Sequence, residues 1–221
     1  MFKFFIRYKA VCACLALFTL SCSGGDKEAD VKSFATEETE ANVFINDYFG
    51  VRVKKPDAWH AATPEQLDLL LGVGKDVVAG GNDDMMTALD ASTKRTFPLF
   101  MFFMHEIGAP VPLNPSIVGM AENMNFMPGV KNGEDYFYHA KKLMAQSNLH
   151  YEFADEYRQR TIGGVTFDVL DLTMSFNGAS VKQTYYAARH GDYVVSFIES
   201  YGADEFKDTT SKIIDSIELD W

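Results

Sequence analysis

Residues 157–201 read YRQRTIGGVTFDVLDLTMSFNGASVKQTYYAARHGDYVVSFIESY, and this stretch decides the fold. Its apolar-rich runs are separated by Gly163-Gly164, Asn177-Gly178 and Gly191-Asp192. Asn-Gly is a strong hairpin signal because a type I′ turn needs positive φ at both central residues. Gly-Gly meets the same requirement, and Gly-Asp suits a type II′ turn. The stretch therefore predicts an antiparallel meander, with strands at 157–162, 165–176, 179–189 and 193–201.

The residues that follow the meander predict a helix packed across it. Apolar and small side chains recur there at helical spacing and form one stripe. These residues are Phe206, Thr210, Ile213, Ile214 and Ile217. A meander followed by an amphipathic helix indicates an α+β architecture.

The half of the chain before the meander predicts two further helices. Thr63 can cap a helix that has Pro64 in its first position, and Gln66 can complete a capping box. Gly80-Gly81 supplies the positive φ that commonly ends a helix. A second helix begins at residues 131–135 and turns Tyr136, Phe137, Ala140, Leu143 and Met144 inward.

Strands are predicted around these helices. Short ones occur at 43–45, 49–54 and 149–154, and the continuous apolar run 97–104 predicts a central strand covered on both faces. Trp59 is expected in the core. Residues 82–94 read as irregular, with a short helical turn around Met85. Residues 116–124 fit either a strand or a helix, and their periodicity slightly favours helix.

The N-terminus predicts a lipoprotein signal. Basic residues at Lys3, Arg7 and Lys9 precede an apolar segment, 10–20, that is too short to span a bilayer. Ser21-Cys22 follows, as in a bacterial lipobox, so we expect a signal peptide at 1–21 and lipid attachment at Cys22. The alternative is an ordinary secretory signal cleaved nearby. Residues 22–42 predict a flexible acidic tether, and residues 43–221 predict one domain.

Cysteine usage and charge exclude several classes of protein. All 3 cysteines lie at positions 12, 14 and 22, so the domain itself has no disulfide, thiol nucleophile or thiolate metal site. The formal net charge of −11 is opposite in sign to the basic footprint of a nucleic-acid binder. We therefore expect no nucleic-acid partner.

Three blocks of sequence resemble the PsbP-like group of extracytoplasmic domains. The first is residues 48–59, YFGVRVKKPDAW, with its Pro-x-x-Trp; the second comprises 164–167, 181–186 and 193–197; the third is 213–217. The resemblance covers 43–221 and implies an α/β/α sandwich with a mainly antiparallel sheet. It also implies that 116–124, preceded by Asn114-Pro115, forms a strand. Members of the group are mostly non-enzymatic binding or accessory proteins, including lipoproteins.

Motifs that carry chemistry are weak in this sequence. The five histidines, at 60, 105, 139, 150 and 190, have no zinc-ligand spacing, although His105-Glu106 could be half of a site. Gly72-x-Gly74-Lys75 lacks the pattern of a phosphate loop, and residues 82–84 lack that of an EF-hand. Seven methionines suit either a soft-metal site or, more readily, an irregular core: Met85, Met86, Met101, Met104, Met120, Met124 and Met127.

Tyrosines on the meander are candidate contact residues. They are Tyr185, Tyr186, Tyr193 and Tyr201. Strand alternation sends Tyr185 and Tyr186 to opposite faces, so one of the two is expected at the surface.

The sequence therefore predicts a membrane-anchored, extracytoplasmic lipoprotein with a non-catalytic PsbP-like domain that binds a protein partner in the bacterial cell envelope. In a Gram-negative cell it would lie on the periplasmic face of the outer membrane. We expect no catalytic residues, cofactor or metal. The alternatives are a small-molecule or metal carrier and, less favoured, a hydrolase that uses histidines and carboxylates from loops.

Overall fold

The computed structural model describes residues 37–39 and 41–221, and these form two antiparallel sheets and four α-helices. The predicted signal peptide, Cys22 and most of the predicted tether lie outside the described residues. The elements are β1 (Glu37–Glu38), β2 (Val43–Asn46), β3 (Val51–Lys54), β4 (His60–Ala61), α1 (Pro64–Ala79), α2 (Asp83–Thr93), β5 (Thr96–Phe103), β6 (Ser116–Asn123), α3 (Gly133–Met144), β7 (His150–Phe153), β8 (Arg158–Ile162), β9 (Val165–Phe176), β10 (Ala179–His190), β11 (Tyr193–Tyr201), the 3-10 helix η2 (Asp204–Phe206), α4 (Lys207–Asp215) and β12 (Glu218–Leu219).

The predicted meander is confirmed as β8 to β11. Asn177 and Gly178 have φ of 50° and 80°, as the type I′ turn requires. Gly163 and Gly164 are also at positive φ, and so is Gly191. The strand order of the large sheet is β4-β5-β6-β11-β10-β9-β7, and β8 also pairs with β9. Both β7 and β8 therefore lie along the same edge of β9, at different positions of its register.

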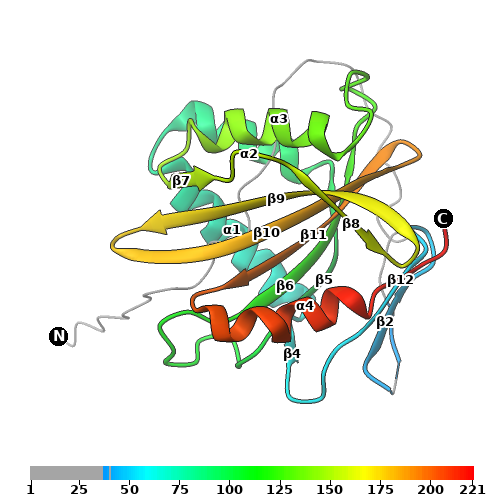
Figure 1. The fold of residues 1–221 in the computed structure, drawn as a ribbon. Coiled ribbons are helices and arrows are strands. Elements are labelled where there is room, and N and C mark those ends of the chain that lie inside the picture. The colour runs from blue at the N-terminus through cyan, green and yellow to red at the C-terminus, as the bar shows by residue number, and fades with distance from the viewer. Residues whose placement is uncertain (1–36, 40) are drawn as a thin grey trace.

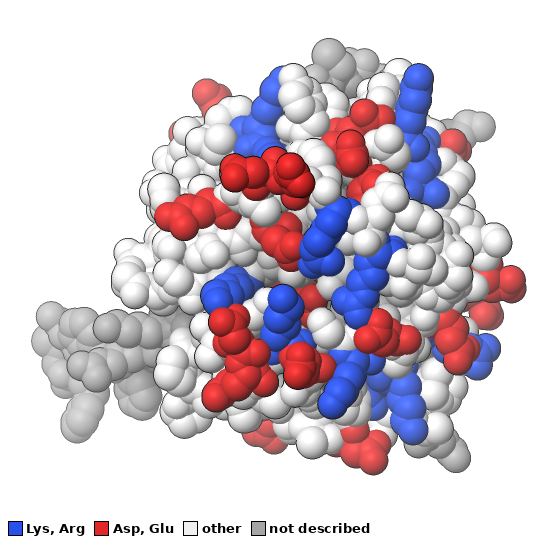
Figure 2. All heavy atoms as spheres, in the orientation of Figure 1, with Lys and Arg blue, Asp and Glu red and all other residues white. Residues whose placement is uncertain are grey.

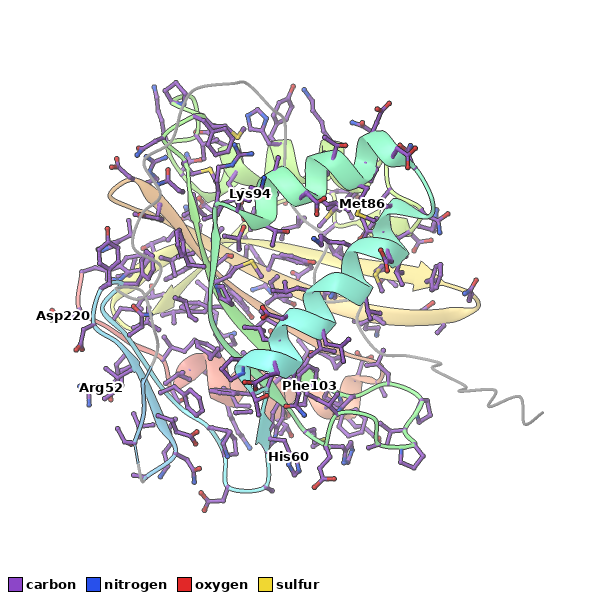
Figure 3. All side chains as sticks on the ribbon, turned by 180° about the vertical axis from the view of Figure 1, so that it is seen from behind. Arg52, His60, Met86, Lys94, Phe103 and Asp220 are labelled. Carbon is purple, nitrogen blue, oxygen red and sulfur yellow. The ribbon has the colours of Figure 1, made fainter. Side chains whose placement is uncertain are left out.

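Residues 116–123 form the strand β6, as the resemblance implied and the periodicity did not. β6 lies between β5 and β11 and is buried on both faces. A strand that is covered on both faces is apolar at nearly every position, so its spacing does not distinguish it from a helix. β5 is less central than predicted, because its outer neighbour is the two-residue β4. His60 of β4 is the register partner of Phe103 of β5, and both residues are labelled in Figure 3.

The prediction for residues 82–94 was wrong, because they form a full helix, α2. Asn82 caps it by accepting a hydrogen bond from the backbone N–H of Met85 at 3.0 Å. Met85, Leu89 and Ser92 face inward at helical spacing, and the many polar residues occupy the exposed side. In α1 the predicted capping box is present, and Gly80 ends the helix in the left-handed conformation.

The large sheet is covered on both faces, which confirms the α+β sandwich. In Figure 1, α3 with α1 and α2 lie on one side of the sheet and α4 on the other. Figure 3 views the molecule from behind, and in it α1 and α2 cross in front of the sheet. Met86 and Lys94 are labelled toward the two ends of α2. One core lies beneath α1, α2 and α3, and a second lies beneath α4 and the small sheet.

The small sheet joins the two ends of the described chain. Its strand order is β1-β2-β3-β12, so β12 pairs with β3 near the beginning of the domain. Residues 37–38, inside the predicted tether, pair with β2, and the ordered sheet therefore starts before Val43. Trp59 is buried in the second core as expected. Among the described residues, no helix combines the length and apolar character that a membrane crossing needs.

Candidate functional site

A group of packed aromatic side chains with one exposed member lies where the small sheet meets one end of the large sheet. We call Tyr48, Phe97 and Tyr193 the aromatic patch. Tyr48 is 51% exposed, and its ring lies 6.0 Å from that of Tyr193 in an edge-to-face arrangement. Phe97 lies 6.0 Å from Tyr193 on the other side. The buried ring of Phe49 supports them from below, at 4.8 Å from Tyr48 and 5.0 Å from Tyr193.

Three segments that are distant in sequence build the patch. Tyr48 is in the β2–β3 turn, which Asn46 shapes by accepting a hydrogen bond from the backbone N–H of Phe49 at 3.0 Å. Phe97 belongs to β5, and Tyr193 is the first residue of β11. Because Phe49 points into the core, its neighbour Tyr48 is directed outward. The patch is therefore held by rigid elements and a short turn.

The patch has an acidic border. Asp47 precedes Tyr48, Asp192 precedes Tyr193, and both aspartates are exposed. Burial, the neighbouring Tyr48 hydroxyl and the charge of Asp192 raise the pKa of the Tyr193 hydroxyl. Tyrosine presents a large apolar area together with a hydroxyl that can donate a hydrogen bond, which is why it is common at contact surfaces. The arrangement suits association with a surface better than chemistry.

A second polar group lies inside the molecule, beneath α4. Glu199 on β11 is 1% exposed and accepts a hydrogen bond from the Tyr186 hydroxyl at 2.5 Å. Ser211 of α4 donates to the same carboxylate at 3.3 Å. Arg160 donates to the Tyr186 oxygen at 2.9 Å and pairs with Asp215 at the end of α4. Burial and the charge of Glu199 raise the pKa of Tyr186, so its hydroxyl stays protonated.

This network continues onto the surface as ion pairs. Arg158 makes two hydrogen bonds to Asp171, at 2.6 and 2.9 Å, and Thr184 donates to the same carboxylate at 2.7 Å. Figure 2 shows basic and acidic side chains interleaved over this face rather than separated by sign. Arg158 and Arg160 of β8 are each paired with an aspartate, and the Arg160 pair links β8 to α4. This group therefore has a structural role.

A third polar group lies on the opposite face of the sheet, beneath α2 and α3. Glu122 on β6 is fully buried, and its Oε2 accepts a hydrogen bond from the Tyr136 hydroxyl at 3.3 Å. Its Oε1 has no hydrogen-bond partner, and neither have the buried Nε and Nη2 of Arg95 or the hydroxyl of Ser196. Burial raises the pKa of Glu122 well above its ordinary value.

The five histidines lie on or just after five different elements of the described chain. His60 is exposed on β4, and His105 follows β5, where Asn114 makes hydrogen bonds to its backbone N–H and C=O. His150 lies 3.6 Å from Glu152 on β7, and His190 stacks on Trp221 at 4.5 Å. Within residues 37–39 and 41–221, no three His, Cys, Asp or Glu side chains converge as a metal site would require.

The other motifs have structural roles. Lys75 lies within α1 and pairs with Asp90 of α2 at 2.6 Å. The seven methionines pack in or against the two cores, six of them in the one beneath α1, α2 and α3. The prediction that Tyr185 or Tyr186 would be exposed was wrong, because both faces of the sheet are covered and both rings are buried. Of the four candidate tyrosines, Tyr193 alone reaches the patch.

Sequence reasoning missed Tyr48 and Phe97 as contact residues, and it missed Arg95 and Glu122 as residues with buried polar atoms that lack a hydrogen-bond partner. Tyr48 was noted only within the motif 48–59. The position of Glu122 directly after the apolar run 117–121 was a local signal for a buried polar group. Nothing local indicated which residues would meet it.

Comparisons with known proteins give structural likenesses at low identity. No protein-family model matches the chain, and neither does any curated protein. The cyanobacterial PsbP of Synechocystis is similar, with 10% identity, a TM-score of 0.49 and coverage of 90% of this chain and 98% of that one. LpqN of Mycobacterium tuberculosis, described as involved in cell envelope biogenesis, has 13% identity, a TM-score of 0.44 and coverage of 76% and 82%.

A protein of unknown function from Pseudomonas aeruginosa, described as a putative regulator, has 12% identity and a TM-score of 0.41 over 52% of this chain and 78% of that one. The fold is assigned from the strand order and the helix layers of this chain.

Proposed function

We propose that the protein is a lipid-anchored accessory protein of the bacterial cell envelope, and that its PsbP-like domain binds a protein partner without catalysing a reaction. The observation that carries the proposal is the aromatic patch, in which Tyr48 is 51% exposed above a rigid cluster of rings. Exposed aromatic side chains on a preorganised support are typical of the central residues of protein interfaces.

The partner is expected to present basic side chains around an apolar centre. Asp47 and Asp192 border the patch, and the whole chain has a net charge of −11. A basic rim on the partner would complement these aspartates and accelerate association, and this contribution weakens as salt screens it. Raising the salt concentration is therefore expected to slow association more than it speeds dissociation.

Photo-crosslinking tests the patch. A photoreactive phenylalanine analogue at position 48 is expected to crosslink one protein in envelope membranes. The matched control is position 138, since Tyr138 is a similarly exposed tyrosine, 56%, on the distant α3. Tyr48→Ala is expected to weaken capture of that protein by about tenfold or more, and Tyr138→Ala to leave it unchanged. Equal crosslinking at both positions, or equal capture by both variants, would contradict the proposal.

The anchor is tested separately. The leader that ends at Ser21-Cys22 supports lipid attachment at Cys22. Cys22→Ala is expected to block maturation or release the protein from membranes, whereas Ser23→Ala is expected to do neither. A mature N-terminus at any residue other than a lipid-modified Cys22, measured by mass spectrometry, would show that the protein is not lipid-anchored through this cysteine.

A further inference from the structure

Two groups of opposite charge type, Glu122 and Arg95, have buried atoms without a hydrogen-bond partner beneath α2 and α3. Glu122 Oε1 has no hydrogen-bond partner, and neither have Nε and Nη2 of Arg95, and these atoms are all out of contact with solvent. Leaving a buried polar group unpaired costs about 1–3 kcal/mol, and more for a charged one. Because arginine keeps its charge, protonation of the Glu122 carboxyl is what lowers the cost of leaving the two groups apart.

The Arg95 side chain rests on an aromatic ring, although its backbone lies beside the Glu122 segment, where its carbonyl accepts a hydrogen bond from the N–H of Asn123 at 3.0 Å. Its guanidinium carbon lies 3.8 Å from the centroid of Phe126, in the segment that follows β6. Hydrogen bonds fix both ends of that segment, from Met124 N–H to the Asp192 carbonyl and from Arg189 to the Val130 carbonyl, each at 2.8 Å. The ring is thus a defined resting place for the cation, worth about 0.5–2 kcal/mol.

Every element around Glu122 contributes a facing group. Those that act on its carboxyl or on Tyr136 are Ser92 of α2, Arg95, Tyr136 of α3, Tyr185 of β10 and Ser196 of β11. His139 lies three residues after Tyr136 and so on the same side of α3, and its buried Nδ1 also has no partner. Arg95 is the one permanent cation of this set. Burial is the main cause that raises the pKa of Glu122, so the carboxyl keeps its proton at a pH where an exposed glutamate has lost it.

We infer that Glu122 is a proton-binding switch: while its carboxyl is protonated Arg95 rests on Phe126, and when the carboxyl ionises Arg95 leaves the ring and pairs with it. An uncompensated buried carboxylate costs several kcal/mol, more than the contact with the ring is worth. The two arrangements are alternatives because one guanidinium cannot occupy both places. The switch adjoins the aromatic patch, since Asn123 follows Glu122 and is the register partner of Tyr193. A role in sensing the pH outside the cell rests on the proposed function; the switch itself does not.

The resonance of the Arg95 Nε–Hε group tests the switch directly and needs no partner protein. In nitrogen-15 spectra of the purified protein, this signal is expected to move with one midpoint between mildly acidic and alkaline pH. In Glu122→Gln it is expected to stay at its acidic position throughout. In Phe126→Leu the midpoint is expected to fall by roughly half a pH unit, because loss of the ring favours the paired arrangement.

Glu218→Gln is the control, because Glu218 is an exposed carboxylate near Arg52 at the far sheet, and it is expected to leave the titration unchanged. An Arg95 signal that does not titrate in the wild type would overturn the inference. So would a signal that titrates identically in Glu122→Gln, because the proton would then bind elsewhere.

Discussion

Glu199 and Glu122 lie on neighbouring strands of one sheet, and both are buried, yet their surroundings differ. Glu199 faces α4 and accepts hydrogen bonds from Tyr186 and Ser211, and Tyr186 is in turn held by Arg160. Glu122 faces the other helices and accepts one hydrogen bond, from Tyr136 at 3.3 Å, while its second oxygen has no partner. Each carboxyl group therefore accepts a hydrogen bond from one tyrosine. For Glu199, that tyrosine also belongs to a larger hydrogen-bonded network.

The difference shows that burial alone does not define the role of a charged residue. A buried polar group with all its partners makes the packing around it specific, because any shift of one member leaves the others unpaired. Around Glu199 that network holds α4 against the sheet. A buried group with missing partners favours its neutral form instead, and it responds to pH. The same residue type is thus structural on one face and titratable on the other.

Tyr186→Phe is expected to have the largest effect, because it breaks the complete network. The change removes the hydroxyl between Arg160 and Glu199 and leaves both without that partner. We expect a loss of about 1.5–3 kcal/mol in the free energy of unfolding, the range for hydrogen bonds to charged groups. Urea denaturation measures it, and a loss below about 0.5 kcal/mol would show that the network does not stabilise the fold.

Glu122→Gln is expected to have a smaller effect of opposite sign. The pKa of Glu122 in the folded protein is raised above its ordinary value of 4.5, so its contribution to stability is fully present below that pH. The contribution is lost as the pH rises through the raised value. Since an amide does not ionise, the variant is expected to gain about 1–2 kcal/mol over wild type at mildly alkaline pH and nothing at acidic pH.

Glu199→Gln is the matched control for this prediction. A carboxylate offers two acceptor oxygens and an amide offers one, so Tyr186 and Ser211 lose part of their acceptor. At mildly alkaline pH this variant is expected to be less stable than wild type by about 1 kcal/mol. Stability changes of the same sign in the two variants would remove the distinction between the two glutamates.

Tyr136→Phe is expected to have the smallest effect. Its hydroxyl lies 3.3 Å from Glu122, whereas that of Tyr186 lies 2.5 Å from Glu199. A long hydrogen bond to a protonated carboxyl is a neutral one, so we expect a loss of at most about 1 kcal/mol in urea denaturation. A loss as large as that of Tyr186→Phe would mean that Glu122 is ionised in the folded protein.

Prediction from sequence succeeded where a few adjacent residues determine the structure. The turns at Gly163-Gly164 and Asn177-Gly178 and the cap at Thr63 depend on local backbone geometry, and each is confirmed. It failed for α2, where polar residues outnumber the inward-facing ones. It also did not predict the two-residue strands β1, β4 and β12, because such strands exist only through pairing with residues elsewhere in the chain.

The sequence by itself determined the meander, the capping box of α1, the buried side of α3 and the leader that predicts an anchor at Cys22. Those features follow from turn chemistry, capping and periodicity, which act within a few residues. The tertiary structure alone decided that β6 separates β5 from β11, that Tyr48 joins Phe97 and Tyr193, and that Glu199 has partners while Glu122 lacks them. These are meetings of side chains from distant segments, and their energy depends on burial and distance, which the local sequence does not contain.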